Sequence, residues 1–338
     1  MVAVDRGSLR CEARSPAQRL LLAHRRALLR RAGPAVLLVL LLAGASPAHA
    51  AFPGRNGRLV YSLGNGGRGG RAAIVVSGPA GGRRRALTAG ETLDISPRWA
   101  PRGGRLAFTR ITSDDTCRIV IINARGHHLR TLPAAARCDS SPAWSPDGRR
   151  LVFERQRPDG SGGHDLWISS ANGHHQRRLT RPQGDDRDPS WSVRNQIVFW
   201  RVTSTGAQID VIAPGARKPR DLSPAPGDYH PDWSPDGRRL AFARLSADGT
   251  SLLFVMGADG RHRRDLGPVP SDRPTDPHFS PDGRCLVFTS YTEARSGIGV
   301  LVLGSRRLHR FAFPAAQAQT PDWQPRPGPR ARASHPRT

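Results

Sequence analysis

The stretch that decides the fold of this 338-residue chain is Ser141-Pro-Ala-Trp-Ser-Pro-Asp-Gly-Arg-Arg-Leu-Val-Phe153. It recurs as His230-Pro-Asp-Trp-Ser-Pro-Asp-Gly-Arg-Arg-Leu-Ala-Phe242 and as Asp276-Pro-His-Phe-Ser-Pro-Asp-Gly-Arg-Cys-Leu-Val-Phe288. Looser copies run from Ser96 to Phe108, from Asp188 to Phe199 and from Phe52 to Tyr61, and a truncated copy is Thr320-Pro-Asp-Trp-Gln-Pro325. Self-similarity of this kind indicates an array of like supersecondary units.

One aromatic residue anchors each copy, and successive anchors lie 42 to 47 positions apart. Large apolar rings at a fixed place in every unit are typical of core packing, so we expect them to be structural. The anchors are Phe52, Trp99, Trp144, Trp191, Trp233, Phe279 and Trp323.

Within each period the chain alternates short apolar runs with turn residues, as in Leu151–Phe153, Leu166–Ile168 and the Gly-bearing turn that ends at Gly173. These runs have strand length, and none shows helical periodicity. Together with the segment around the aromatic residue, each period supplies four strands, which is a propeller blade. Seven anchors enclose six periods. The sequence therefore predicts an all-β, six-bladed β-propeller of four-stranded blades, with the ring closed by the N- and C-terminal strands.

The motif Pro-x-Trp-Ser-Pro-Asp-Gly, followed by a strand, an Asp/Asn-Gly turn and Leu-Thr, resembles the repeat of TolB-type six-bladed β-propellers (the WD40-like, PD40 repeat). The opening Ala51-Phe-Pro-Gly-Arg-Asn-Gly is similar to the start of secreted actinobacterial members. The resemblance covers residues 52–325 and departs from the repeat at Trp99-Ala-Pro-Arg-Gly, Trp191-Ser-Val-Arg-Asn and Trp323-Gln-Pro. It implies a binding module that engages another protein at the loop face around the central channel.

Residues 1–50 are expected to be a signal peptide, because arginines precede the apolar run Ala35–Leu42 and Ala48-His-Ala50 is a small-residue cleavage site. Sec export to the cell envelope or the extracellular space follows. The apolar run is too short to cross a membrane, and the mature chain has no other candidate span. Domain boundaries are therefore predicted at 1–50 for the leader, 51–325 for the propeller and 326–338 for a disordered basic tail.

Cys117 and Cys138 fall in loops that the strand count places on one face, where an oxidising compartment would allow them to pair. The formal net charge is +25, carried almost entirely by arginine. These arginines are scattered over every unit without interleaved stacking aromatics, which disfavours a nucleic-acid partner. An anionic cell-wall polymer is a more plausible target for this charge. We expect a monomer.

Acidic residues precede the anchors at similar positions, five before (Asp94, Asp139, Asp186 and Asp228) or three before (Asp188 and Asp276). Two hypotheses follow. In the first, the acidic residues form a ring at the channel mouth that binds a protein partner or, through oxygen ligands, a divalent cation. In the second, the acidic residues cap turns and pair with local arginines. No resident cofactor is expected, and the identity of any metal stays open.

Catalysis has little support, because no Gly-x-Ser-x-Gly motif is present. His164 with Asp165 and His230 with Asp228 are the acid/base pairs worth naming, and no catalytic residue is assigned. The favoured interpretation is an exported, non-catalytic scaffold with an envelope or secreted protein partner. The alternatives are a metal-dependent, carbohydrate-active lyase or hydrolase at the acidic mouth, and adhesion to anionic envelope polymers.

Overall fold

The computed structural model describes residues 52–64, 71–89, 91–159, 161–181, 184–223, 226–246, 248–267, 269, 273–292, 296–311, 313 and 317–326. The predicted leader at 1–50 and residues 327–338 of the predicted tail lie outside these ranges. Within them the chain is all-β, and no helix long and apolar enough to cross a membrane occurs in this part. Arg326, placed in the tail by the sequence, is the last residue of a strand.

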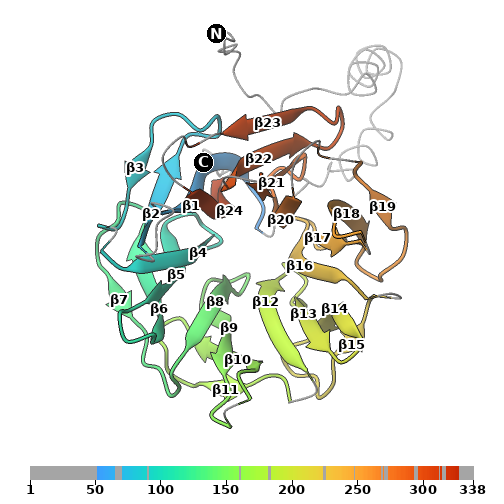
Figure 1. The fold of residues 1–338 in the computed structure, drawn as a ribbon. Helices are drawn as coiled ribbons and strands as arrows, with labels where there is room; N and C mark the ends of the chain where they lie inside the picture. Colours follow the sequence, from blue (N-terminus) through green and yellow to red (C-terminus); the bar gives the residue numbers. More distant parts are fainter. Residues whose placement is uncertain are drawn as a thin grey trace, which may run out of the picture. The chain divides into compact units, whose positions relative to one another are not determined.

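The strands follow one another in antiparallel groups of four (Figure 1). Group 1 is β24 (Gln317–Arg326), β1 (Arg55–Gly64), β2 (Ala72–Ser77) and β3 (Arg85–Ala86). Group 2 is β4 (Leu93–Trp99), β5 (Arg105–Ile111), β6 (Cys117–Asn123) and β7 (Arg130–Thr131). Group 3 is β8 (Asp139–Trp144), β9 (Arg150–Gln156), β10 (His164–Ser170) and β11 (Arg177–Arg178). A single parallel bridge, Ala72↔Leu93, joins groups 1 and 2 into one sheet.

The second half of the chain repeats this order. Group 4 is β12 (Asp185–Trp191), β13 (Ile197–Thr203), β14 (Gly206–Ile212) and β15 (Arg220–Asp221). Group 5 is β16 (Asp228–Trp233), β17 (Arg239–Leu245), β18 (Ser251–Gly257) and β19 (Arg264–Asp265). Group 6 is β20 (Arg273–Phe279), β21 (Cys285–Tyr291), β22 (Ser296–Val302) and β23 (Leu308–Phe311). In Figure 1 the first strand of each group lies innermost.

The hydrophobic core is divided into clusters that lie between consecutive groups. Trp144, for example, packs with Ile119 of β6 and Phe153 of β9, and Trp233 packs with Val198 of β13 and Met256 of β18. The four tryptophans at 99, 144, 191 and 233 are at most 2% exposed. A ring of this size buries about 150–250 Å². The repeated aromatic residues are therefore core residues that pack between neighbouring groups, as the sequence predicts.

The Ser-Pro-Asp-Gly turn joins the first strand of a group to the second through its own side chains. Asp147 Oδ1 accepts from the Ser145 hydroxyl at 2.6 Å and from the Arg149 amide at 3.0 Å, while Gly148 takes a φ of 67°. A positive φ costs glycine nothing sterically. The turns at Ser234–Arg239 and Ser280–Cys285 repeat the Ser–Asp contact, at 2.7 and 2.6 Å.

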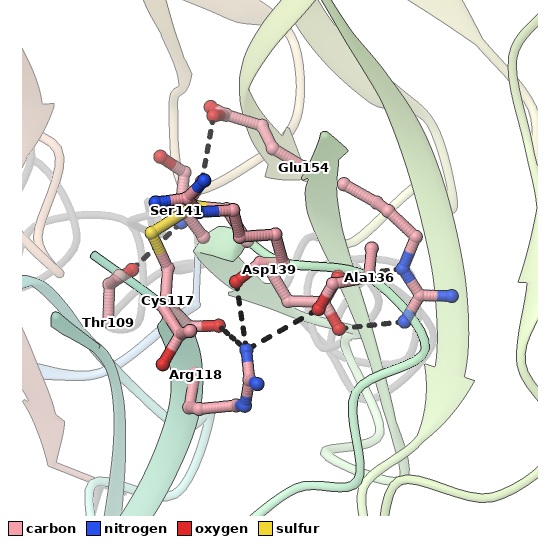
Figure 2. The surroundings of a disulfide bond; sticks show 12 residues. Thr109, Cys117, Arg118, Ala136, Asp139, Ser141 and Glu154 are labelled. Atoms are coloured by element: carbon pink, nitrogen blue, oxygen red, sulfur yellow. Dashed lines mark hydrogen bonds and ion pairs between the residues drawn. A yellow bond between two sulfur atoms is a disulfide. The ribbon is translucent and has the colours of Figure 1, made fainter. Parts of the chain in front are cut away.

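A disulfide links Cys117, the first residue of β6, to Cys138, the residue before β8, and therefore joins groups 2 and 3 (Figure 2). Beside it, Arg118 Nη1 donates to the carbonyl oxygens of Cys117 and Arg137 at 2.8 and 2.9 Å. Neighbouring groups are held here by a covalent bond and a guanidinium group as well as by apolar packing.

Candidate functional site

Each innermost strand contains a β-bulge three residues before its aromatic anchor. The residue at the bulge has a φ between 44° and 52° and always precedes a proline. A non-glycine residue in this region costs roughly 1–2 kcal/mol, and a bulge re-aims the side chains around it. We call these residues the bulge set: Ser96, Ser141, Asp188, His230, Asp276 and Thr320.

A second set of side chains stands one residue before each anchor and lines a shared cavity of about 40 Å³. Because each innermost strand contributes one residue to this single cavity, the cavity lies at the centre of the groups. We call these residues the cavity set: Arg98, Ala143, Ser190, Asp232, His278 and Asp322. The volume has room for a few water molecules at most.

The bulge set is joined by contacts that run from strand to strand. His230 lies between two carboxylates, with Nδ1 2.6 Å from Asp276 Oδ1 and Nε2 3.3 Å from Asp188 Oδ2. The Ser141 hydroxyl donates to Asp188 at 3.1 Å, and the Ser96 amide donates to Thr320 Oγ1 at 3.2 Å. Polar side chains thus connect group 3 to group 4, group 4 to group 5 and group 5 to group 6. A separate contact connects group 1 to group 2.

The charges around His230 stabilise its imidazolium form. Burial lowers the pKa of His230, but the carboxylates of Asp276 and Asp188 outweigh burial and raise it to about 9. Burial would raise the pKa of Asp276, yet the charge of the adjacent His230 holds that pKa well below its usual range. The arrangement at neutral pH is one cation between two anions.

Aromatic and acidic groups surround this triad. Trp200 donates its indole N–H to Asp188 Oδ2 at 2.8 Å, and the rings of Trp200 and Tyr229 lie 5.5 and 4.9 Å from the His230 ring. Glu154 of β9 accepts from the Asp188 amide at 2.5 Å. Burial, followed by the charge of Asp188, raises the pKa of Glu154 to about 7.

The cavity set holds a second, more deeply buried network. Arg98 Nη1 lies 2.6 Å from His278 Nε2, which requires that nitrogen to accept and leaves the proton on Nδ1, 3.4 Å from Asp232 Oδ1. Ser190 donates to Asp232 at 2.8 Å, and Asp322 accepts from the Trp99 amide at 2.7 Å. Burial raises the pKa of Asp232, but contacts with His278 and Arg98 more than offset this and lower it.

The six predicted acidic residues divide into two kinds. Asp188 and Asp276 belong to the bulge set. Asp94, Asp139, Asp186 and Asp228 are at most 3% exposed, and each accepts two bonds from an arginine on the next strand of its own group. These four carboxylates form bidentate pairs inside the sheet. Their positions differ from the hypothesis of a ring at the channel mouth and agree with the alternative that they pair with local arginines.

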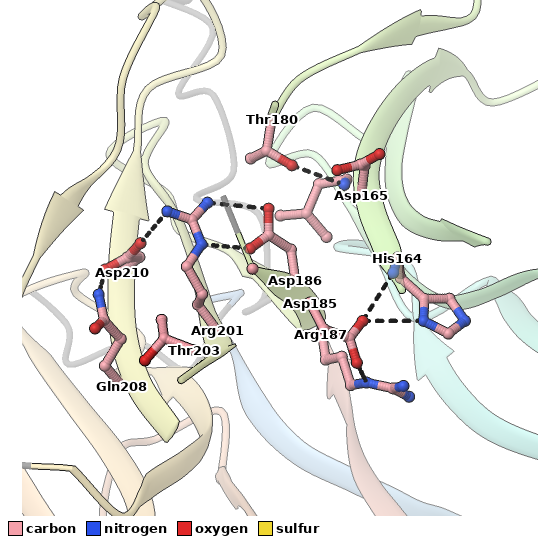
Figure 3. A network of polar contacts seen from close by, with 12 residues as sticks. His164, Asp165, Thr180, Asp185, Asp186, Arg187, Arg201, Thr203, Gln208 and Asp210 are labelled. Carbon is pink, nitrogen blue, oxygen red and sulfur yellow. Dashed lines mark hydrogen bonds and ion pairs between the residues drawn. The ribbon is translucent and has the colours of Figure 1, made fainter. Parts of the chain in front are cut away.

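The pair in group 4 extends to a third strand (Figure 3). Arg201 donates to Asp186 at 2.6 and 3.0 Å, and its Nη1 lies 3.0 Å from Asp210 Oδ2 on β14. One guanidinium group therefore ties β12, β13 and β14 together. Asp210 also accepts from Gln208 at 2.9 Å.

A sequence signal for these pairs exists. An arginine follows the second-strand phenylalanine by two positions in Phe108-Thr-Arg, Phe153-Glu-Arg, Phe199-Trp-Arg and Phe242-Ala-Arg. These are the groups that carry an aspartate five before the anchor. Asp94↔Arg110 and Asp228↔Arg244 are direct cross-strand neighbours. Group 6, with Pro274↔Ser290 at this register, carries neither partner.

The two histidine pairings expected from sequence proximity are wrong. His164 Nδ1 lies 3.1 Å from Asp185 rather than bonding Asp165, and His230 contacts Asp188 and Asp276 rather than Asp228 (Figure 3 for His164). Asp228 and Asp165 are instead paired with arginines. His164 and Asp165 are adjacent on β10, so their side chains point to opposite faces of the sheet. Asp228 and His230 are two residues apart, and the β-bulge at His230 turns the imidazole away from Asp228. Among the described residues, no group of three or more His, Cys, Asp or Glu is placed to hold a metal ion.

The family model described as the TolB beta propeller domain matches residues 55–230. The match covers more than half of the chain, and the protein belongs to this family. No protein among curated sequences matches significantly.

Solved structures share the fold at low sequence identity. The crystal structure of TolB from Acinetobacter baumannii is 17% identical with a TM-score of 0.71, over 80% of this chain and 67% of that one. A structure assigned to TolB from Agrobacterium tumefaciens is 16% identical with a TM-score of 0.60, over 79% and 99%. The tricorn protease is 16% identical with a TM-score of 0.56, over 76% of this chain but 26% of that one. The likeness establishes an antiparallel all-β fold of TolB-propeller type.

Proposed function

We propose that this chain is an exported, non-catalytic binding scaffold that engages a protein partner around the axis of a closed, six-bladed propeller. The face concerned is the loop face, where the second and third strands of each group are connected. The observation that carries the proposal is the Asp188–His230–Asp276 triad, a half-buried polar cluster built by three different groups of strands.

Ring closure is supported by the pairing of the two ends of the described chain. β24 pairs antiparallel with β1, from Arg55↔Arg326 to Gly64↔Gln317, and Trp323 is 4% exposed. If the ring is closed in solution, Trp323→Ala should cost about 3–5 kcal/mol of unfolding free energy. A loss below 1 kcal/mol in urea denaturation would show that β24 does not close the ring.

Partner binding is supported by the chemistry of the triad and its rim. The side chains of His230, Asp188 and Asp276 are 23%, 25% and 14% exposed. Trp200 and Tyr229 stand beside them as half-buried rings. Charged donors and acceptors next to amphipathic aromatics are typical of binding centres for polypeptide segments.

The test uses the protein as bait on envelope and secreted extracts at moderate salt. We expect one discrete protein to bind wild type and to be lost from Asp188→Asn/Asp276→Asn. The matched control, Asp115→Asn/Asp248→Asn, makes the same charge change in exposed loops of the same face and should retain the partner. Capture of polyanions alone, released by salt, would contradict the proposal.

Export is supported by the Cys117–Cys138 disulfide, because structural disulfides persist in oxidising compartments. N-terminal sequencing of the protein recovered outside the cytoplasm should begin at Ala51. A non-catalytic role is part of the same proposal. Turnover of a glycan or peptide substrate that is lost with a chelator, or with His230→Ala, would favour the enzyme alternative instead.

A further inference from the structure

A cleft of about 420 Å³ lies between groups 4 and 5 on the turn face, opposite to the loop face. One wall is formed by Arg194, Gln196, Val211 and Arg220 of group 4, and the other by residues of group 5 that include Gly237 and Arg238. Trp233, 2% exposed, lies at its base. The volume is within the range of small-molecule sites, which hold roughly 300–1,000 Å³.

The repeat is altered at this junction, as it also is where Cys285 follows Phe279 by six positions. At three other junctions an arginine at the start of a second strand covers the next aromatic anchor: Arg105 over Trp144 at 4.8 Å, Arg150 over Trp191 at 5.0 Å and Arg239 over Phe279 at 5.5 Å. In the turn Trp191-Ser-Val-Arg-Asn-Gln the corresponding residue is Gln196, and the turn is one residue shorter. At this junction, therefore, no arginine at the start of the second strand lies over the Trp233 ring.

A polar group of the residue at the base of the cleft also lacks an acceptor. The indole N–H of Trp191 donates to Asn195 Oδ1 at 3.0 Å, and Asn195 has a φ of 58°. Gly237 holds the equivalent turn position below Trp233, with a φ of 63°. The Trp233 N–H is buried and has no hydrogen-bond partner among the described residues, as is also the case for the N–H groups of Trp99 and Trp323.

The cleft is basic, and its arginines are not neutralised by side chains. Arg194 donates to the Asp236 carbonyl at 3.0 Å and Arg220 to the Asp259 carbonyl at 3.5 Å, both backbone oxygens. Within the described residues, Arg194, Arg220 and Arg238 form no ion pair. The acidic side chain in the lining is Asp259, whose Oδ1 accepts the Arg261 amide in its own turn.

We propose that this cleft is a binding site for a phosphate ester. Three guanidinium groups offer more donors than the two oxygens of a carboxylate can accept, whereas a phosphate group presents three or more charged or polar oxygens. The cleft volume exceeds what a bare ion needs, so the organic group of the ester is accommodated beside the phosphate. This site is independent of the partner-binding role proposed for the loop face.

The test titrates glucose 1-phosphate into the full chain at constant ionic strength and measures heat, with inorganic phosphate and glucose as separate arms. We expect saturable binding of glucose 1-phosphate, weaker binding of inorganic phosphate and none of glucose. Arg194→Gln/Arg238→Gln should weaken binding about tenfold or more. The matched control Arg102→Gln/Arg149→Gln, exposed in equivalent turns of groups 2 and 3, should change it by less than about twofold.

A charge-neutral variant separates the cleft from general electrostatic attraction. Gly237→Asn suits the positive φ, because asparagine tolerates this region. A Cβ at this position would lie 3.0 Å from Arg194 Cγ, so the new side chain displaces Arg194 and fills the cleft. Binding should fall about fivefold or more although the net charge is unchanged. Undiminished binding by this variant, an equal loss in the control, or no saturable binding to wild type would each overturn the proposal.

Discussion

Asp186 and Asp188 lie two residues apart in β12, yet Asp186 is bound within its own strand group and Asp188 contacts the next group. The Asp186 side chain is 0% exposed and accepts two bonds from Arg201, whereas Asp188 is 25% exposed and contacts His230 of the next group. The positive φ of Asp188 and the register shift between Arg187 and Ser190 separate them. A bulge therefore separates carboxylates that pair with arginine inside one strand group from carboxylates that contact the neighbouring group.

The largest expected effect on stability comes from breaking one of the buried Asp–Arg pairs. Asp139→Ala leaves the Arg155 guanidinium, 6% exposed, with Gln176 as its remaining side-chain hydrogen-bond acceptor. An uncompensated buried charge costs about 3–5 kcal/mol. Urea denaturation measures this loss, with Glu91→Ala at an exposed position as control. A loss of less than 1 kcal/mol in unfolding free energy would mean that the Asp–Arg pairs do not stabilise the sheet.

The second prediction concerns pH and the triad. The folded pKa of His230, about 9, lies above the usual histidine value of 6.5, so its contribution to stability is complete below pH 6.5 and is lost as pH rises to 9. That contribution is at most about 3 kcal/mol. The stability difference between wild type and His230→Gln should therefore be largest below pH 6.5 and shrink by pH 9. A difference that stays constant over this window would show that His230 is not held as a cation.

The smallest effect is expected from Asp188→Asn. Asparagine keeps one acceptor oxygen, which can replace Oδ2 opposite the Trp200 indole, while its NH2 group faces the Ser141 hydroxyl, which can accept instead of donating. His230 keeps Asp276. The cost should be within about 1 kcal/mol, as for partly exposed ion pairs. NMR titration should show the His230 pKa moving down from about 9. An unchanged pKa would leave Asp276 as the sole partner that matters.

The strand groups and their anchors could be predicted because they depend on local pattern. A turn such as Ser145-Pro-Asp-Gly specifies its own hydrogen bonds, and apolar runs on either side specify strands. The Asp–Arg pairs could also have been predicted from the sequence, since Phe-x-Arg appears in the units that carry an aspartate five positions before the anchor. The partners of His230 could not, because Asp188 and Asp276 lie in other repeats, each more than 40 residues away.

By itself, the sequence determined the repeat, the all-β class and the family, since each of these is written in short stretches that fold against their immediate neighbours. The tertiary structure decided which carboxylates meet His230 and which meet arginine, and it placed an open cleft at Trp233. The physical reason is that a bulge and a one-residue turn deletion change side-chain direction locally, while their consequences appear only where separate groups of strands converge.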